Sequence, residues 1–242
     1  MSKANPRTVQ MMFSTLVILA LQLLATVQFG FSQEVAVSAA DTIPVLSSSS
    51  FRDDIGAYHI VGEVKNNSPA ESMKYVRIVA TLYDNAGKVI GTDFTFTDVN
   101  VLRPAEKSSF KIILSDLGQS QKVTSYKLST SAVRTQALPA SLRLTIGESH
   151  LDTIGAYHIG GKVTNHGSQK ATFVKVSGAF YNRTNVVVAA DYTYTEPKDL
   201  ESGQTAPFEI IVTSATYAHQ ITYASLNADS IQYSVVGHNE TS

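Results

Sequence analysis

One hexapeptide, Ile-Gly-Ala-Tyr-His-Ile, occurs twice in this chain of 242 residues, at positions 55–60 and 154–159. The two copies start 99 residues apart, which is about the length of one small domain. A repeat at such a spacing indicates a duplicated structural unit, because each copy has to rebuild the same packed core. The repeated hexapeptide therefore predicts two related domains.

The similarity continues beyond the hexapeptide, with an offset of 98 residues after the first loop. Residues 82–84 match 180–182, and residues 93–98 match 191–196, with Phe exchanged for Tyr and Asp for Glu. Such exchanges keep the character of each position, as two copies of one core require. We predict the following segments: an N-terminal signal or anchor (1–40), a first domain (41–136), a linker (137–140), a second domain (141–236) and a tail (237–242).

Both copies show the alternation of apolar and polar residues that is typical of β-strands. Around the first hexapeptide, Tyr58, Ile60 and Val64 share one face, and we expect the other face, with His59 and Glu63, to point outward. Residues 84–87 predict a type I turn with Gly87 in the left-handed conformation. The run of three serines at residues 48–50 predicts a loop. The prediction is an all-β chain with two tandem antiparallel β-sandwiches.

At this level of detail the chain resembles a known family, the FxLYD domains. Their motif corresponds to Ala80-Thr81-Leu82-Tyr83-Asp84, and their Tyr-x-Ile/Val-x-Gly-x-Val-x-Asn pattern corresponds to residues 58–66. The leading Phe is replaced by Ala80, and the second copy reads Gly178-Ala179-Phe180-Tyr181-Asn182. The resemblance covers most of residues 43–236. It implies immunoglobulin-like β-sandwiches of exported prokaryotic proteins, and it carries over no catalytic residue.

The N-terminal segment predicts export. Lys3 and Arg7 precede an apolar run over residues 11–27, and small residues suited to cleavage follow at Ser32, Ala39 and Ala40. This order is typical of a secretory signal. If it is not cleaved, the same run is long enough to serve as a membrane anchor. Either way we expect an extracellular or cell-surface location, with the membrane contacted only through this segment.

Composition excludes several classes of function. The chain has no Cys and no Trp, so disulfides, thiolate zinc sites and iron–sulfur clusters are excluded. The net charge is −1, and no basic stripe is present to bind nucleic acid. No nucleophile elbow and no zinc-protease helix occur, so we expect no enzyme and no catalytic residue.

The repeated histidines His59 and His158 are the first candidates for a binding site. A metal site needs three or four protein ligands, and the sequence shows no ligand spacing around either histidine. Sequence spacing does not reveal ligands from neighbouring strands, so this question stays open. Asp54 and Asp152 precede the two copies and are candidate calcium ligands at a domain junction. Solvated turn carboxylates are the simpler interpretation, and we expect neither metal nor cofactor.

Two further features have two interpretations each. The aromatic pairs 94/96 and 192/194 either pack in the core or form a platform for sugar, and we expect the core. The sequons at Asn66, Asn182 and Asn239 are either glycan acceptors or ordinary turn residues.

We therefore expect a non-enzymatic, exported interaction or structural protein, with a protein or envelope partner that contacts an edge strand or the inter-domain groove. The alternative is an accessory carrier of a small ligand or metal ion.

Overall fold

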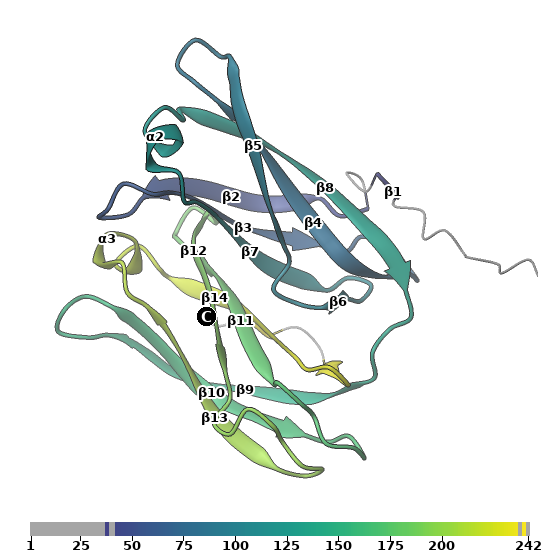
Figure 1. Cartoon of the computed structure of the whole chain (residues 1–242). Coiled ribbons are helices and arrows are strands. Elements are labelled where there is room, and N and C mark those ends of the chain that lie inside the picture. The colour runs from purple at the N-terminus through teal and green to yellow at the C-terminus, as the bar shows by residue number, and fades with distance from the viewer. Residues whose placement is uncertain (1–36, 39–41, 237–238, 241–242) are drawn as a thin grey trace, which may run out of the picture. The chain divides into compact units, whose positions relative to one another are not determined.

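The computed structural model describes residues 37–38, 42–236 and 239–240, and these residues belong to one compact unit. The described chain is almost entirely β, as predicted, with two single-turn helices (Figure 1). In chain order the elements are β1 (Val37–Ser38), β2 (Val45–Arg52), β3 (Tyr58–Lys65), β4 (Ser72–Tyr83), β5 (Val89–Phe96), β6 (Val101–Leu102), β7 (Lys107–Leu114), α2 (Leu117–Ser120), β8 (Ser125–Thr135), β9 (Ala140–Leu151), β10 (Tyr157–Asn165), β11 (Lys175–Tyr181), β12 (Val187–Tyr194), β13 (Thr205–Val212), α3 (Ala215–Ala218), β14 (Tyr223–Asp229), β15 (Ser234–Val235) and β16 (Asn239–Glu240).

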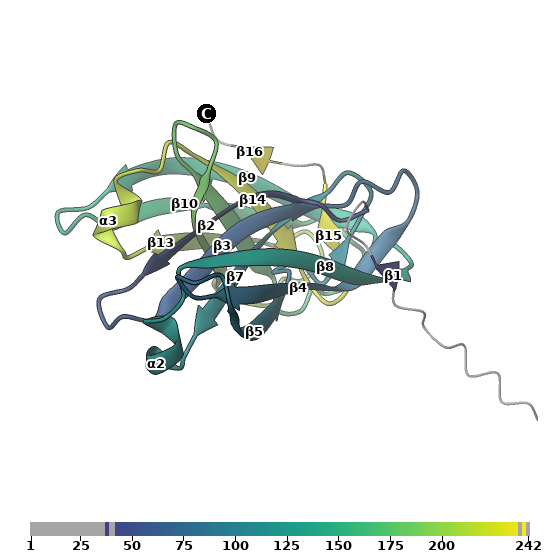
Figure 2. The ribbon, with the colours of Figure 1, turned by 90° about the horizontal axis from the view of Figure 1, so that it is seen from above.

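Repeat 1, residues 42–135, forms two sheets together with β1, which precedes it in the chain. One has the order β2-β3-β7, and the other has the order β1-β8-β4-β5 with β6 added to β4. All pairs in both sheets are antiparallel. Figure 2 shows β1 beside the C-terminal end of β8. One hydrophobic cluster holds the two sheets together, and its largest buried side chains include Ile60, Ile78, Leu82 and Phe110.

Repeat 2, residues 140–236, repeats the order of the main strands and differs at the sheet edges, where β15 and the following β16 pair with β14. Strands β9-β10-β13 correspond to β2-β3-β7, and β12-β11-β14 correspond to β5-β4-β8. Here β15 pairs with β14 on one side and with β9 on the other, so that all strands belong to one eight-stranded sheet. A second cluster, which includes Phe180, Leu142 and Ile159, forms the core. Equivalent cores in the two repeats are what the duplicated sequence predicts.

Each repeated hexapeptide enters the first central strand, β3 or β10. Gly62 and Gly161 leave room for an aromatic ring of the neighbouring strand: a Cβ atom on Gly62 would lie 2.5 Å from Cζ of Phe110. The predicted turn after β4 is confirmed, because the Gly87 amide donates to the Asp84 carbonyl and Gly87 has φ +74°. The serine run 48–50 was wrongly assigned to a loop, since it lies within β2 and pairs with β3.

The sheet β2-β3-β7 is covered on both faces. Tyr58, Ile60 and Val64 point into the core of repeat 1, as predicted, whereas Val61 and Glu63 are also buried, with exposed fractions of 0% and 1%. Val61 belongs to a third hydrophobic cluster, whose other members come from repeat 2 (Ala179, Tyr181, Val187, Ala190). The expectation that this face points outward was therefore wrong, because β11 and β12 of repeat 2 pack against it.

Candidate functional site

The repeated histidines belong to a hairpin motif. At the β2–β3 turn, Oδ1 of Asp53 accepts hydrogen bonds from the amides of Ile55 (3.2 Å) and Ala57 (2.8 Å), and Oδ2 lies 2.9 Å from Nε2 of His59. Gly56 has φ +87°, a conformation that favours glycine. One carboxylate therefore caps the turn and holds the histidine ring, which gives the hexapeptide a structural role.

The β9–β10 turn repeats the motif and extends it. Asp152 caps the turn at Ile154 and Ala156, and its Oδ2 lies 3.3 Å from Nε2 of His158. Nδ1 of His158 lies 3.0 Å from Oε1 of Glu209 on β13. The hydrogen bond to Glu209 is the main cause that raises the pKa of His158; desolvation opposes it, and Asp152 adds to it. Loss of hydration works to raise the pKa of Asp152, but the turn amides and His158 outweigh it and lower the pKa.

These clusters correct the choice of acids in repeat 1. Asp53, and not the exposed Asp54, corresponds to Asp152 and contacts the histidine. The 99-residue offset between the hexapeptides contained this signal, because it relates position 152 to position 53. Among the described residues no group of three or more His, Asp or Glu side chains is arranged to hold a metal ion. The rings of His150 and His158 stack with centroids 5.0 Å apart, so their in-plane nitrogens do not converge.

An aromatic stack links His59 to repeat 2 through Phe51. Its ring lies parallel to that of Phe51, with centroids 4.8 Å apart, and Phe51 in turn lies 4.1 Å from the ring of Tyr217. A cavity of about 220 Å³ adjoins this stack, and its wall includes the ion pair of Lys111 and Asp191, 3.2 Å apart. The histidine is thus half-buried at the junction of the repeats.

Glu63 is a buried carboxylate at the junction of the repeats. It is 1% exposed, and its Oε2 accepts a hydrogen bond of 2.5 Å from the hydroxyl of Tyr181. Ser225 donates to Oε1, and Nζ of Lys107 lies 3.9 Å from Oε2. A buried carboxylate is tolerated only when it is paired and hydrogen-bonded. The corresponding residue of repeat 2 is Lys162, which is exposed.

Asp229 is a second buried acidic residue at the junction of the repeats. Asp229 accepts hydrogen bonds from the amide (2.9 Å) and the side chain (2.7 Å) of Asn100 in repeat 1. Burial raises the pKa of Asp229 to about 6, against the attraction of Lys175. Burial likewise raises the pKa of Asp98, although Ser109 donates a hydrogen bond to it. The junction therefore contains polar groups matched across the two repeats.

The aromatic pairs were wrongly assigned to the core. Phe94 and Phe96 are each 48% exposed, and Tyr192 and Tyr194 are 49% and 37% exposed. In each pair the rings meet edge to face, with centroids 6.0 Å and 6.1 Å apart. The guanidinium of Arg77 lies 3.9 Å from the ring centroid of Phe94. Because the two rings of a pair are perpendicular, they do not form a flat sugar platform.

A further aromatic residue is exposed at the same place in each repeat. Tyr75 (φ +50°) and Phe173 (φ +53°) adopt the left-handed conformation and are 62% and 57% exposed. Bulky residues rarely adopt it, because it costs about 1–2 kcal/mol. Tyr75 lines a groove of about 660 Å³ together with Phe96 and with Ile231 of repeat 2, which is 60% exposed. The sequence did not reveal these residues as a group, since the chain separates Tyr75 and Ile231 by 156 positions.

The sequons differ in their surroundings. Asn66 is fully buried, and its Nδ2 donates to the carbonyls of Glu71 (2.8 Å) and Leu102 (2.9 Å), which leaves no room for a glycan on this atom. Asn182 is half-buried in the turn between β11 and β12, where its Oδ1 accepts from Val186 and Thr184. Asn239 lies in β16.

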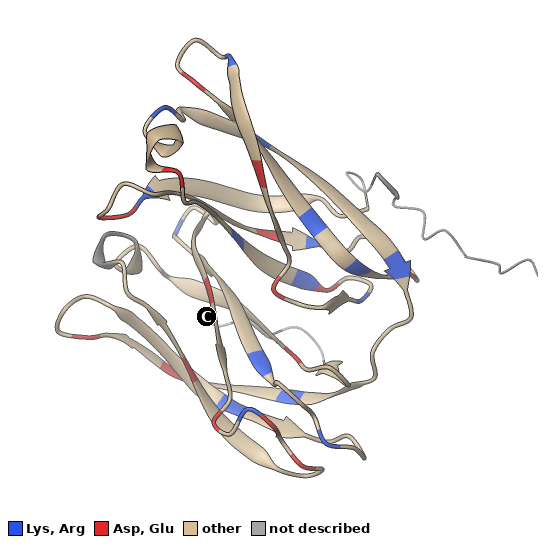
Figure 3. Cartoon of the chain, in the orientation of Figure 1, with Lys and Arg blue, Asp and Glu red and all other residues tan. Residues whose placement is uncertain are grey.

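Lys, Arg, Asp and Glu are scattered over the strands and loops of both repeats, and the described residues form no continuous basic stripe (Figure 3). Within residues 37–38, 42–236 and 239–240, no helix has the length and apolar character needed to cross a bilayer. The expected signal or anchor, residues 1–40 with the apolar run 11–27, falls almost wholly outside the described residues.

The chain matches no protein-family model and no curated protein. Solved structures with some likeness include red sea bream transglutaminase (TM-score 0.27, 10% identity, 82% of this chain and 31% of that chain). Others are a calcium-binding mutant of Bacteroides uniformis β-glucuronidase 2 (0.27, 11%, 81% and 28%) and Amycolatopsis orientalis exo-chitosanase CsxA (0.30, 9%, 80% and 26%). The chain thus spans about a third or less of those chains, and at these scores the likeness carries no argument about activity.

Proposed function

We propose that the protein is a non-enzymatic, exported interaction protein built from two immunoglobulin-like β-sandwich domains of the FxLYD type, 41–136 and 141–236. The duplicated strand order and the two equivalent cores support this organisation. The polar contacts of Glu63 and Asp229 favour a fixed relation between the domains, since a misaligned junction leaves buried carboxylates unpaired. A fixed pair of domains is suited to present a composite surface.

One observation carries the interaction hypothesis: both repeats expose an aromatic residue in a strained backbone conformation, Tyr75 and Phe173. Strain of this kind costs stability, and it concentrates at functional sites. In repeat 1 the strained residue lines the apolar groove with Phe96 and Ile231. Exposed aromatic residues at such grooves are typical anchors of protein–protein contacts. The proposed partner is therefore a protein of the cell envelope that inserts an apolar side chain here.

The test compares variants of the full chain in binding to envelope extract, followed by identification of the bound protein and titration with that protein in purified form. Tyr75→Ser should weaken the purified interaction by about 10-fold or more, as expected for an interface anchor worth at least 1.4 kcal/mol. The control is Ile55→Ser, because Ile55 is a large apolar side chain that is 76% exposed at a hairpin tip outside the groove. Equal loss in both variants, or none in either, contradicts the proposal.

The carrier alternative is tested on the same preparation. Stoichiometric metal or small ligand retained after dialysis, and released by His59→Ala or His158→Ala, would support a carrier and contradict a purely interacting role. Export is tested by cell fractionation, in which the interaction hypothesis requires the protein outside the cytoplasm.

A further inference from the structure

The edge of β8 that faces β2 is only partly covered. Along its other edge β8 pairs with β4 from Ser125 to Thr135. On the open side it pairs with β1 at two positions, Ser131 and Ala132. Of the strands in the described part of the chain, no other pairs with this edge. An unpaired strand edge presents backbone amides and carbonyls that can form a further ladder.

Repeat 2 shows what covers the same edge there. Its β14 corresponds to β8, and it pairs with β15 at Asp229 and with β16 at Ser225 and Leu226. Strand β1 takes the place of β15 in repeat 1, since Ser131 corresponds to Asp229. The counterparts of Ser225 and Leu226 are Lys127 and Leu128, which form no such pair. Leu226 is fully buried, whereas Leu128 is only half-buried.

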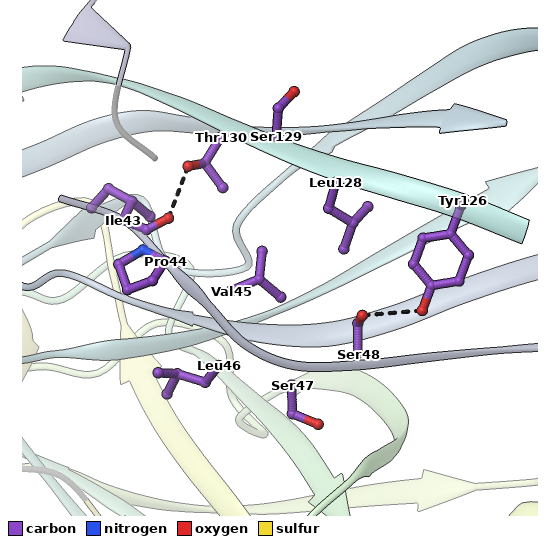
Figure 4. A pocket seen from close by; sticks show the side chains of 10 residues that line it. All are labelled: Ile43, Pro44, Val45, Leu46, Ser47, Ser48, Tyr126, Leu128, Ser129 and Thr130. Atoms are coloured by element: carbon purple, nitrogen blue, oxygen red, sulfur yellow. Dashed lines mark hydrogen bonds between the residues drawn. The ribbon is translucent and has the colours of Figure 1, made fainter. Parts of the chain in front are cut away.

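A groove of about 490 Å³ lies at this position, between β2 and β8 (Figure 4). Two hydrogen bonds join its walls: Ser48 with the hydroxyl of Tyr126 (3.0 Å), and the Thr130 hydroxyl with the carbonyl of Ile43 (2.8 Å). Val45 and Leu128 point toward one another between these bonds, so the floor is apolar. Residues 126 to 130 of an extended strand span about 13 Å, which is room for roughly four residues of another strand.

We propose that this edge binds an extended segment of a partner protein, which adds to β8 as an antiparallel strand at Lys127 and Leu128, as β16 adds to β14. The inference rests on the proposed interaction function and names its second contact surface. Side chains of the bound strand alternate between the groove floor and the outer face of the sheet. The floor, Val45 and Leu128, fits an apolar residue.

The outer face defines the other half of the pattern. Lys127 is exposed there, and it lies beside Tyr83 at 5.7 Å from the ring centroid. An acidic residue directly across from a lysine stabilises an antiparallel pair. In repeat 2 the register position across from the counterpart of Lys127 is Glu240. The ligand is therefore an extended peptide in which apolar and acidic residues alternate.

The test uses the full-length protein and two synthetic peptides of equal composition, one alternating (Glu-Val-Glu-Val-Glu-Val) and one in blocks (Glu-Glu-Glu-Val-Val-Val). The alternating peptide should slow hydrogen exchange of the amides in residues 126–130 in a saturable manner, and the block peptide should not. Lys127→Glu should weaken binding roughly 2- to 10-fold, because an opposite-charge pair becomes a like-charge pair. Lys162→Glu, on the outer face of β10, is the matched control and should leave binding unchanged.

Three results overturn the proposal: no protection of residues 126–130 at saturating peptide, equal protection by both peptides, or protection in the protein alone that depends on concentration and disappears when residues 239–242 are deleted. The last result assigns the edge to the tail of a second copy. If Tyr75→Ser abolishes binding of the envelope partner while Lys127→Glu does not, the β8 proposal fails and the interaction function stands.

Discussion

Replacement of Glu63 by alanine is the perturbation whose effect the structure defines best. The carboxylate is 1% exposed and accepts hydrogen bonds from the hydroxyls of Tyr181 and Ser225. In Glu63→Ala these two hydroxyls lose their shared acceptor, and the nearby ammonium of Lys107 loses an anion at 3.9 Å. Removal of one partner of a buried charged network costs about 3–5 kcal/mol. For a unit of this size, that loss corresponds to a fall of roughly 6–20 °C in Tm.

The assay is urea and thermal unfolding followed by tyrosine fluorescence and circular dichroism, which suits a chain with 11 Tyr and no Trp. Lys162→Ala is the matched control, because Lys162 holds the same position on the exposed face of β10, and its effect should stay within about 0.5 kcal/mol. Glu63→Gln should lie between the two, since the amide keeps one acceptor oxygen. Equal destabilisation by Glu63→Ala and Lys162→Ala, or a loss of less than about 1 kcal/mol in Glu63→Ala, would show that the buried carboxylate does not stabilise the junction.

Three further predictions concern strain, pH and self-association. Tyr75→Gly should leave the unfolding free energy unchanged or raise it by up to about 1 kcal/mol in urea titrations, because glycine relieves the strain at φ +50° but loses more chain entropy; a loss above 1 kcal/mol would contradict this. Since burial raises the pKa of Asp229 to about 6 from 3.8, its stability contribution is complete below pH 3.8 and is lost as the pH rises through 6. The unfolding free energy of Asp229→Asn relative to wild type should therefore rise by about 2–3 kcal/mol between pH 3.5 and pH 7.5, and a pH-independent difference would count against the raised pKa. If one copy stacked on the next as repeat 1 stacks on repeat 2, Lys162 of one copy would meet Lys127 of the other, at the place where Glu63 meets Ser225 within the chain, and the two like charges would repel. The double variant Lys127→Ser, Lys162→Glu should therefore sediment as oligomers at concentrations where wild type does not. An unchanged sedimentation coefficient would show that this charge repulsion does not prevent self-association.

The parts of the fold that depend on local sequence followed from the sequence. The alternation around Tyr58, Ile60 and Val64 predicts strands with a core face, and the turn at Gly87 follows from its residue types. Burial of the opposite face did not follow, because it is caused by β11 and β12, more than 100 residues away. The same alternation is produced by a half-exposed strand and by a strand covered on both faces with a polar side chain paired across the junction.

The predictions for the aromatic pairs and for the acidic residue of the first hairpin turn were wrong for different reasons. Phe94 and Phe96 share a face, but periodicity does not say which face of an edge strand meets the core. Here Asp93 and Thr95 are on the more buried side, and Thr92 shares the exposed face with the two rings. Asp53 and Asp54 are adjacent acids that only the register with Asp152 distinguishes. The strain at Tyr75 is a backbone property, and residue type gives no indication of it.

Native-state hydrogen exchange shows whether the packing of Val61 and Glu63 against repeat 2 makes the two repeats one cooperative unit. The slowest amides of β3 and of β14 should report the same free energy of opening, equal to that of global unfolding, and Glu63→Ala should lower both together. Two different free energies, with the value for β14 unchanged in Glu63→Ala, would show that the repeats unfold independently.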